Sequence, residues 1–171
     1  GDGIDQLYGS GLFFAKYDTD GNYIWAKSVQ NGAYHPVKGI AVDDNGGVYI
    51  TGAFNSYSDF DPGDGVANLT SKGADDIYFA KYDADGNYLW AHSIGGKWYD
   101  YGEEIIVDSD GGVYITGTVI MWDFEGDYQT TIDFDPGPEQ NTLGNWQYPS
   151  YTSFVAKYSL NDECGEPDGD N

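Results

Sequence analysis

The sequence is poor in basic residues and cysteine. Seven basic residues stand against 29 acidic ones, which gives a formal net charge of −22 at pH 7. Nucleic acids and anionic membrane surfaces carry charge of the same sign, so this imbalance argues strongly against both as partners. The one cysteine, Cys164, cannot form a disulfide within the chain, so the fold is not stapled by disulfides.

Long apolar runs and catalytic signatures are also missing. No apolar stretch approaches a membrane span and no signal peptide is recognisable, and because the chain starts at Gly1 we expect a processed product or a fragment. His35 and His92 do not occupy equivalent positions, and there is no serine nucleophile elbow, HExxH helix or glycine-rich phosphate loop. Carboxylate pairs of the kind that glycosidases use do occur, but they recur with the repeat, which favours a structural role. We therefore expect no enzymatic activity.

A 65-residue internal repeat dominates what the sequence does contain. Residues 14–28, FAKYDTDGNYIWAKS, recur at 79–93 as FAKYDADGNYLWAHS. Between Phe13 and Gly52, 23 of 40 positions are identical to their partners 65 residues later, and a third copy opens at Phe154 with FVAKY. A repeat of this length predicts an array of β units.

The units consist of short strands rather than helices. Runs of 5 to 8 residues rich in Val, Ile, Tyr, Phe and Trp are bounded by Asp, Asn and Gly clusters. Each Asp-Gly dipeptide between two such runs favours a hairpin, because glycine tolerates the positive φ that tight turns need. In one full unit we expect strands at 39–43, 48–54, 77–82 and 87–94, with a polar loop from Ser58 to Asp75.

Four antiparallel strands per repeat are the content of a β-propeller blade, so the predicted fold class is all-β, with propeller-like four-stranded antiparallel blades. The chain divides into a partial blade at 1–34, a full blade at 35–99, a partial blade at 100–160 with a loop insertion at 118–131, and an acidic tail at 161–171. About two and a quarter repeats of 65–76 residues do not close a ring. We therefore expect flanking blades or further chains to complete it.

The recurring motifs resemble a known family. FAKYD-x-DGNYLWAHSIGG, then IxVDSDGGVYITG and then DFDPG follow one another in the same order between Leu12 and Tyr158, apart from the insertion. They resemble the SBBP-type β-propeller repeat of bacterial secreted and surface proteins. The resemblance implies a propeller fold, an extracellular or cell-surface location and a structural or binding role, and it supplies no catalytic residues.

Acidic hairpin turns are the first candidates for a metal site. The segments that begin at Asp18 and Asp83 place a second carboxylate, Asp20 or Asp85, two positions later, which resembles the opening of a calcium loop. Neither segment has the glutamate that an EF-hand needs at its twelfth position. Plain turns, in which the aspartate accepts backbone N–H groups, explain the same pattern. That is also the simplest role for the aspartates of the other tight turns: Asp43, Asp44, Asp108 and Asp110.

The DFDPG loops are stronger candidates for calcium. In an extended chain Asp59 and Asp61 point to one side and Phe60 to the other, and the pattern recurs in residues 133–137. The phenylalanine would anchor the loop, while two carboxylates repel each other unless a cation or N–H donors compensate. Both outcomes stay open. The candidate ligands in these loops are Asp59, Asp61, Asp64, Asp133 and Asp135.

The aromatic residues fall into two groups. One group recurs at the repeat period and is expected in the core or between blades: Tyr17, Trp25, Tyr49, Tyr82, Trp90 and Tyr114. The other mostly lacks aromatic counterparts in the first copy: Trp98, Tyr99, Tyr101, Trp122, Tyr128, Trp146, Tyr148 and Tyr151. Exposed aromatic rings beside carboxylates suit sugar stacking or a protein partner. A local cluster that packs the long loops is the alternative.

These observations favour a non-enzymatic extracellular module of a surface or filament-forming assembly, with Ca²⁺ as the candidate cofactor and a role in adhesion or structure. The expected partner is protein, either copies of this chain or flanking blades. The fourth strand of the first unit, 22–29, would pair with the open edge of 153–158. The alternative is a polysaccharide-binding propeller that uses the unmatched aromatic residues.

Overall fold

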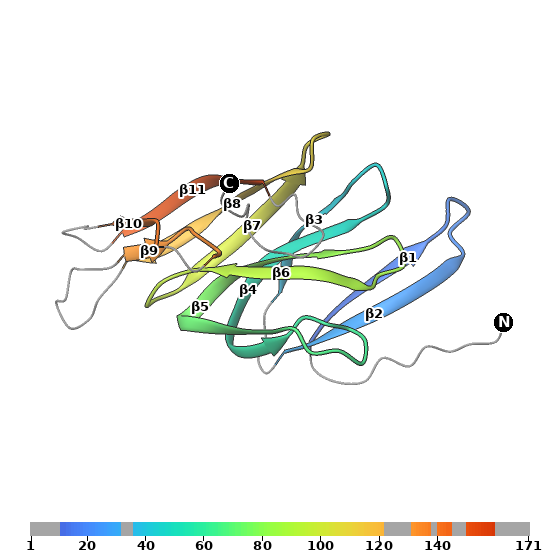
Figure 1. Cartoon of the computed structure of the whole chain (residues 1–171), viewed down its shortest axis with the longest axis horizontal. Helices are drawn as coiled ribbons and strands as arrows, with labels where there is room; N and C mark the ends of the chain where they lie inside the picture. The colour runs from blue at the N-terminus through green and yellow to red at the C-terminus, as the bar shows by residue number, and fades with distance from the viewer. Residues whose placement is uncertain (1–10, 32–35, 122–130, 138–139, 145–149, 160–171) are drawn as a thin grey trace.

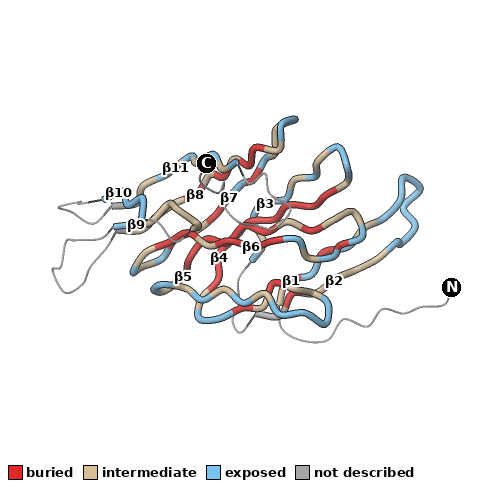
Figure 2. Tube along the Cα trace, in the orientation of Figure 1, coloured by how far each residue is buried: buried red, intermediate tan, exposed pale blue. Residues whose placement is uncertain are grey.

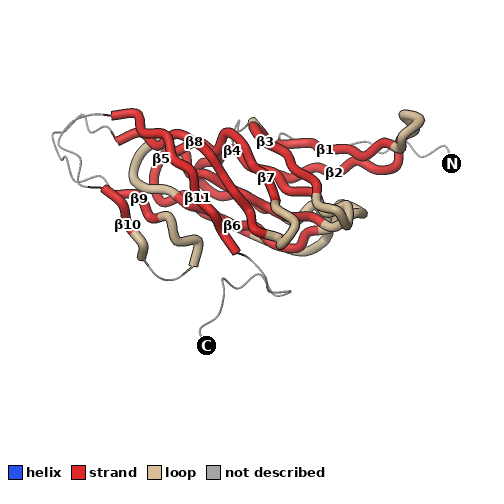
Figure 3. Tube along the Cα trace, turned by 90° about the horizontal axis from the view of Figure 1, so that it is seen from above, coloured by secondary structure: helices blue, strands red, loops and turns tan. Residues whose placement is uncertain are grey.

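The structure is a computed structural model, and it describes residues 11–31, 36–121, 131–137, 140–144 and 150–159 (Figure 1). These residues form strands and no helix (Figure 3), and among them no helix is long and apolar enough to cross a membrane. The strands are antiparallel throughout, so the predicted all-β class is confirmed. The strands are β1 Gly11–Tyr17, β2 Tyr23–Asn31, β3 Val37–Val42, β4 Val48–Asp59, β5 Asn68–Tyr82, β6 Tyr88–Ile94, β7 Asp100–Val107, β8 Gly112–Met121, β9 Thr131–Asp133, β10 Thr142–Gly144 and β11 Ser150–Ser159.

Three groups of strands follow one another along the chain. The second sheet is the four-stranded meander β3-β4-β5-β6, in which each strand pairs with its neighbour in sequence. The hairpin β1-β2, which we call the first sheet, joins the meander in one six-stranded hydrogen-bonded sheet through the pairing of β2 with the end of β4. The third sheet is β7-β8-β11. The short strands β9 and β10 pair with each other beside the third sheet. The unit boundaries proposed from the sequence stay predictions, since several of them fall outside the described residues.

In the second sheet, residues 48–54 of β4 and 76–80 of β5 are buried on both faces, because the sheet lies between the other two (Figure 2). Alternate side chains of a strand point to opposite faces. On β5, Phe79 packs toward the third sheet with Ile105 and Ile115, whereas Tyr82 packs toward the first sheet with Phe14. The Phe14 and Tyr82 rings are 4.7 Å apart, and the Phe79 and Tyr158 rings are 4.9 Å apart. Two aromatic-rich cores, one on each side of the second sheet, therefore hold the three sheets together.

One sequence-based expectation was wrong. The polar loop expected from Ser58 to Asp75 is mostly strand: β5 begins at Asn68, and Asn68–Thr70 pairs with β4. The register shifts near Ser56, whose φ of 57° marks an irregularity that lets both strands continue as a polar extension. Tyr17, expected in the core or between blades, is 59% exposed, because it lies on the face of β1 that points away from the second sheet; its place between blades stays a prediction.

Candidate functional site

The tight turns that carry part of the predicted site residues lie along one end of the sheets (Figure 1). We call this end, with the β1–β2, β3–β4, β5–β6 and β7–β8 turns, the turn end. Asp18, Asp20, Asp83 and Asp85 belong to these turns. The other metal candidates belong to two longer segments: Asp59, Asp61 and Asp64 to the end of β4 and the β4–β5 loop, and Asp133 and Asp135 to the end of β9 and the residues after it.

The β5–β6 turn at the turn end is built around the carboxylate of Asp83. Its Oδ1 accepts the backbone N–H groups of Asp85 at 2.8 Å and Asn87 at 2.9 Å, and its Oδ2 accepts the Asn87 side-chain amide at 2.8 Å. Gly86 takes a φ of 76°, which lets the chain close the turn. Burial opposes ionisation of Asp83, but the hydrogen bonds from Asn87 outweigh it, so the pKa of Asp83 is lowered.

The β1–β2 turn repeats this geometry. The Oδ1 atom of Asp18 accepts the N–H groups of Asp20 at 2.9 Å and Asn22 at 2.7 Å, and the Asn22 side chain lowers the pKa of Asp18 most. In both turns the first aspartate is occupied by donors of the turn itself, while the second is exposed. A plain turn accounts for this geometry, and metal binding here stays a prediction.

The β3–β4 turn adds a lysine and a tyrosine to the same arrangement. Asp43 Oδ1 accepts the N–H groups of Asn45 at 3.0 Å and Gly47 at 2.8 Å. Its Oδ2 accepts the Tyr49 hydroxyl at 3.2 Å and lies 3.4 Å from Lys81 Nζ. The Lys81 ammonium also lies 4.8 Å from the centre of the Tyr49 ring, so it is held by an ion pair and a cation–π contact.

The third sheet repeats this lysine–aspartate–tyrosine group. Asp108 accepts the N–H groups of Asp110 at 3.0 Å and Gly112 at 2.7 Å, and Lys157 Nζ donates to its Oδ2 at 3.1 Å. Lys157 lies 4.8 Å from the centre of the Tyr114 ring. The group is therefore a structural feature of the repeat, which the sequence-based search did not find because its members are far apart in the chain.

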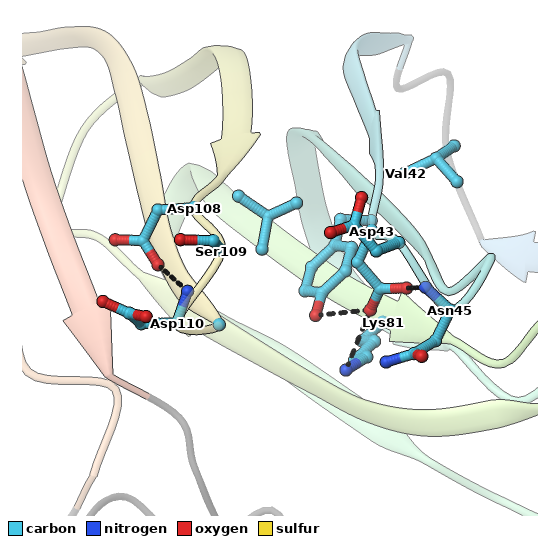
Figure 4. A pocket seen from close by; sticks show the side chains of 11 residues that line it. Val42, Asp43, Asn45, Lys81, Asp108, Ser109 and Asp110 are labelled. Atoms are coloured by element: carbon cyan, nitrogen blue, oxygen red, sulfur yellow. Dashed lines mark hydrogen bonds and ion pairs between the residues drawn. The ribbon is translucent and has the colours of Figure 1, made fainter.

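A cleft of about 460 Å³ separates the β3–β4 turn from the β7–β8 turn (Figure 4). Its rim carries the exposed side chains of Asp44, Ser109 and Asp110. Burial raises the pKa of Tyr49. Burial opposes the shifts of Asp43 and Lys81, but hydrogen bonds and opposite charges outweigh it, lowering the pKa of Asp43 and raising that of Lys81. The pKa values of all three groups are thus shifted further from neutral pH, which suits binding rather than general acid–base catalysis.

The first DFDPG loop is anchored by its phenylalanine. Phe60 is fully buried, and its ring packs against Phe54 and Tyr78 at 5.8 and 4.9 Å. Asp59 Oδ1 accepts the N–H groups of Asp61 at 3.1 Å and Ala67 at 2.8 Å. The anchoring role predicted for the phenylalanine matches its position, and backbone donors surround the neighbouring carboxylate.

The second DFDPG loop has the same internal bonds and one additional contact. Asp133 Oδ1 accepts the N–H groups of Asp135 and Asn141, both at 3.1 Å. Its Oδ2 accepts Lys72 Nζ of the second sheet at 3.0 Å. The Asp135 carboxylate accepts hydrogen bonds from the Gly137 N–H at 2.7 Å and from the Asn141 side-chain amide at 2.9 Å. Among the described residues, three or more His, Cys, Asp or Glu side chains nowhere gather in a group able to hold a metal ion.

Both DFDPG loops join one sheet to the next. Asp59 pairs with Gln30 at the end of β2, and Asp133 pairs with Gly95 just after β6. Gln30 and Gly95 are 65 residues apart, so the two pairings are the same joint in successive repeats. Joining sheets is thus a role of these loops that single-sequence reasoning missed.

The unmatched aromatic residues are only partly described. The Tyr99 and Tyr101 rings stack at 6.4 Å with an interplanar angle of 15°, and Tyr99 is 46% exposed. Lys97 Nζ lies 5.3 Å from the centre of a Trp98 ring. These residues lie together at the crossover from β6 to β7. The candidates Trp122, Tyr128, Trp146 and Tyr148 lie outside the described residues, and Tyr151 is exposed on β11.

Comparison with known proteins supports the repeat assignment. Residues 89–118 match the family model described as SBBP, beta-propeller repeat, which confirms the resemblance for that segment. An uncharacterized WD repeat-containing protein of Acanthamoeba polyphaga mimivirus is 29% identical over 114 residues, covering 58% of this chain and 8% of that protein. The matched region is therefore a small part of that relative. Both comparisons point to a repeat-containing binding or structural module.

Proposed function

We propose that this chain is a non-enzymatic structural and binding segment of an extracellular β-propeller protein, in which blade packs against blade in a surface or filament-forming assembly. The observation that carries the proposal is the repeated joint between sheets. The pairs Gln30–Asp59 and Gly95–Asp133 occupy equivalent positions, so one mode of contact already operates twice. Because successive sheets of this chain are joined in the same way twice, a further sheet of the same kind is suited to join in that way as well.

The first sheet presents such a surface. Phe13 and Tyr17 are 50% and 59% exposed on the face of β1 that points away from the second sheet. Their equivalents 65 residues later, Tyr78 and Tyr82, are fully buried against the first sheet. A like blade would cover Phe13 and Tyr17 in the same way, with the hydrophobic gain that large apolar side chains give on burial.

The third sheet presents the complementary surface. Among the described residues β11 pairs with β8 along one edge, and its other edge is open. Tyr151 and Val155 on β11 are 70% and 75% exposed. An open strand edge is a template for another strand. A fourth strand equivalent to β2, from another copy of this chain or from a flanking blade, would complete the third sheet.

Light scattering of the 171-residue chain over a range of concentrations tests this proposal. We expect concentration-dependent self-association that Y17D or V155D weakens, because each places a charge on one of the two surfaces. Val66 is 72% exposed in the β4–β5 loop, so V66D is a matched control that should associate like the parent chain. A folded monomer at all concentrations would reject assembly between copies.

We further propose that the segment works outside the cell and is stabilised by Ca²⁺. The net charge of −22 favours cation uptake, and each DFDPG loop holds two carboxylates on one short segment. Protease treatment of intact cells that make the protein tests the location. Release of peptides from this chain is the expected result, and their retention within the cells would oppose it.

A carbohydrate-binding role is the second candidate, supported by the exposed tyrosine stack. Tyr99 offers a partly exposed ring already supported from behind by Tyr101, which suits stacking against a sugar. A glycan array probed with the parent chain and Y99A tests this role. Y57A is the matched control, since Tyr57 is 58% exposed at another position. Binding that Y99A removes and Y57A leaves would support the sugar site, and no binding to any glycan would reject it.

A further inference from the structure

Two buried carboxylates lie at the junction between the second and third sheets. Asp76 on β5 is fully buried, and Asp100, the first residue of β7, is 3% exposed. Asp76 Oδ2 accepts the N–H of Lys72 at 2.8 Å, and Asp100 Oδ2 accepts the N–H of Gly96 at 2.8 Å. The Asp76 side chain therefore bonds to the backbone of β5, and the Asp100 side chain bonds to the backbone of the β6–β7 crossover. This crossover connects the second sheet to the third.

The crossover packs directly on the Asp76 carboxylate. A Cβ atom added to Gly95 would lie 2.4 Å from the carboxyl carbon and 2.5 Å from Oδ1, so glycine alone fits there. The Oδ1 atom of Asp76 is buried and has no hydrogen-bond donor among the described residues. An ionised carboxylate in that position costs free energy, and binding of a proton removes this cost.

The charges that surround the pair add to this cost. Burial raises the pKa of both aspartates most, and Asp75 on β5 adds a smaller upward shift to each. Asp75 accepts a hydrogen bond from the Asn55 amide at 3.1 Å. Tyr101 on β7 also bonds to Asp75. Asp76 and Asp100 repel each other in turn. Three negative groups therefore share this junction.

The neighbouring cations offset the negative charge only in part. The Lys72 side chain is 46% exposed and its Nζ donates to Asp133 at 3.0 Å. Its charge favours ionisation of Asp76, but burial outweighs it. Lys97 of the crossover lies against the Trp98 ring. The described residues offer no group of three acidic or histidine side chains able to hold a metal ion. A proton is thus the ligand that best relieves the buried negative charge.

We propose that the buried pair Asp76 and Asp100 binds protons at the junction of the second and third sheets, so that the junction tightens as the pH falls below neutrality and loosens as it rises. This device does not depend on the proposed function. It would make the contact between two consecutive blades respond to the acidity of the surroundings.

The sign of the effect follows from the two titrations. Burial raises the pKa of Asp76 to about 6 and that of Asp100 to about 7, whereas both are near 4 in an unfolded chain. Between about pH 4 and pH 7 the folded chain therefore binds more protons than the unfolded chain. The resulting stability is fully present below about pH 4 and is lost as the pH rises through 6 and 7. Each proton involved changes the unfolding equilibrium constant by up to about tenfold per pH unit.

Carbon-13 NMR titration of the aspartate carboxyl groups in the full chain tests the proposal directly. D76N and D100N identify the two signals, and D44N is the matched control because Asp44 is exposed. We expect both signals to titrate between about pH 5.5 and 7.5. Titration of both below pH 4.5 would overturn the proposal, and so would midpoints that a chelator shifts, since a bound cation would then be the ligand.

Amide hydrogen exchange gives a second readout in the parent chain. The N–H groups of Lys72 and Gly96 donate to the two carboxylates, so their protection reports the junction itself. After correction for intrinsic rates, the protection of these two amides should fall as the pH rises from 5 to 8. The fall should exceed that of the Asn45 N–H, which donates to Asp43 in an exposed turn. Equal pH dependence at the three amides would contradict a proton-linked junction.

Discussion

The hydroxyl group of Tyr82 donates a hydrogen bond of 3.0 Å to the carbonyl oxygen of Phe60. Strand β5 is thereby tied to the DFDPG loop that precedes it. Tyr158 makes the same bond, also at 3.0 Å, to the carbonyl oxygen of Phe134 in the next repeat. Both tyrosines end the recurring AKY motif, so this motif and the DFDPG loop, distant in sequence, act together as one anchor.

The tyrosine anchor leads to the first prediction. Y82F removes the donor and leaves the buried Phe60 carbonyl oxygen unpaired, which should lower the free energy of unfolding by roughly 1–3 kcal/mol. Urea denaturation measures the change. Y17F is the control, because Tyr17 occupies the equivalent repeat position but is 59% exposed, and it should be near neutral. Equal losses in the two variants would contradict the role of the bond.

Truncation of the loop phenylalanines gives the second prediction. F60A should lower the free energy of unfolding by about 3–5 kcal/mol, since Phe60 is fully buried against Phe54 and Tyr78. F134A should cost less, because Phe134 is only partly buried. Denaturation of the two variants side by side measures the difference. A larger loss for F134A than for F60A would show that the burial is misassigned.

The third prediction concerns Ca²⁺. If the DFDPG loops bind the ion, its removal should lower the melting temperature, because a ligand that binds only the folded state stabilises it. Melting curves with calcium and with chelator, at equal ionic strength, measure the shift. D61N and D135N should reduce it, whereas D44N should not. An unchanged midpoint, together with no metal by elemental analysis, would reject calcium binding.

The acid side of the stability profile gives the fourth prediction. The pKa of Asp83 is lowered because hydrogen bonds from Asn87 outweigh the opposing effect of burial. The pKa of Asp133 is lowered because hydrogen bonds from Lys72 and the backbone likewise outweigh burial. Groups with a lowered pKa stabilise the fold above their unfolded value near 4 and lose this effect as the pH falls. Combined with the opposite behaviour of Asp76 and Asp100, stability should be greatest at about pH 5.

Urea denaturation between pH 3 and pH 8 measures this profile. D83N removes one contribution on the acid side and should flatten the profile there without changing its alkaline side. Stability that rises steadily from pH 3 to pH 8 would contradict the opposing shifts.

The repeated motifs predicted most of the fold. The 65-residue period and the Asp-Gly turns located the hairpins, because local turn chemistry and strand alternation are written in neighbouring residues. The polar pairing of Asn68–Thr70 with β4 was missed, since its strands lack an apolar alternation and depend on the irregularity at Ser56. Asp76 and Asp100 were missed for a related reason. Neither residue is distinctive in sequence, and only the crossover at Gly95 buries them together.

Face-to-face packing of consecutive sheets is tested most directly by nuclear Overhauser effects between aromatic rings of the full chain. The Phe14 and Tyr82 ring centres are 4.7 Å apart across the first and second sheets, and those of Phe79 and Tyr158 are 4.9 Å apart across the second and third. Repeated blade packing predicts cross-peaks for both pairs. Strong cross-peaks within each sheet, with neither inter-sheet pair connected, would contradict it.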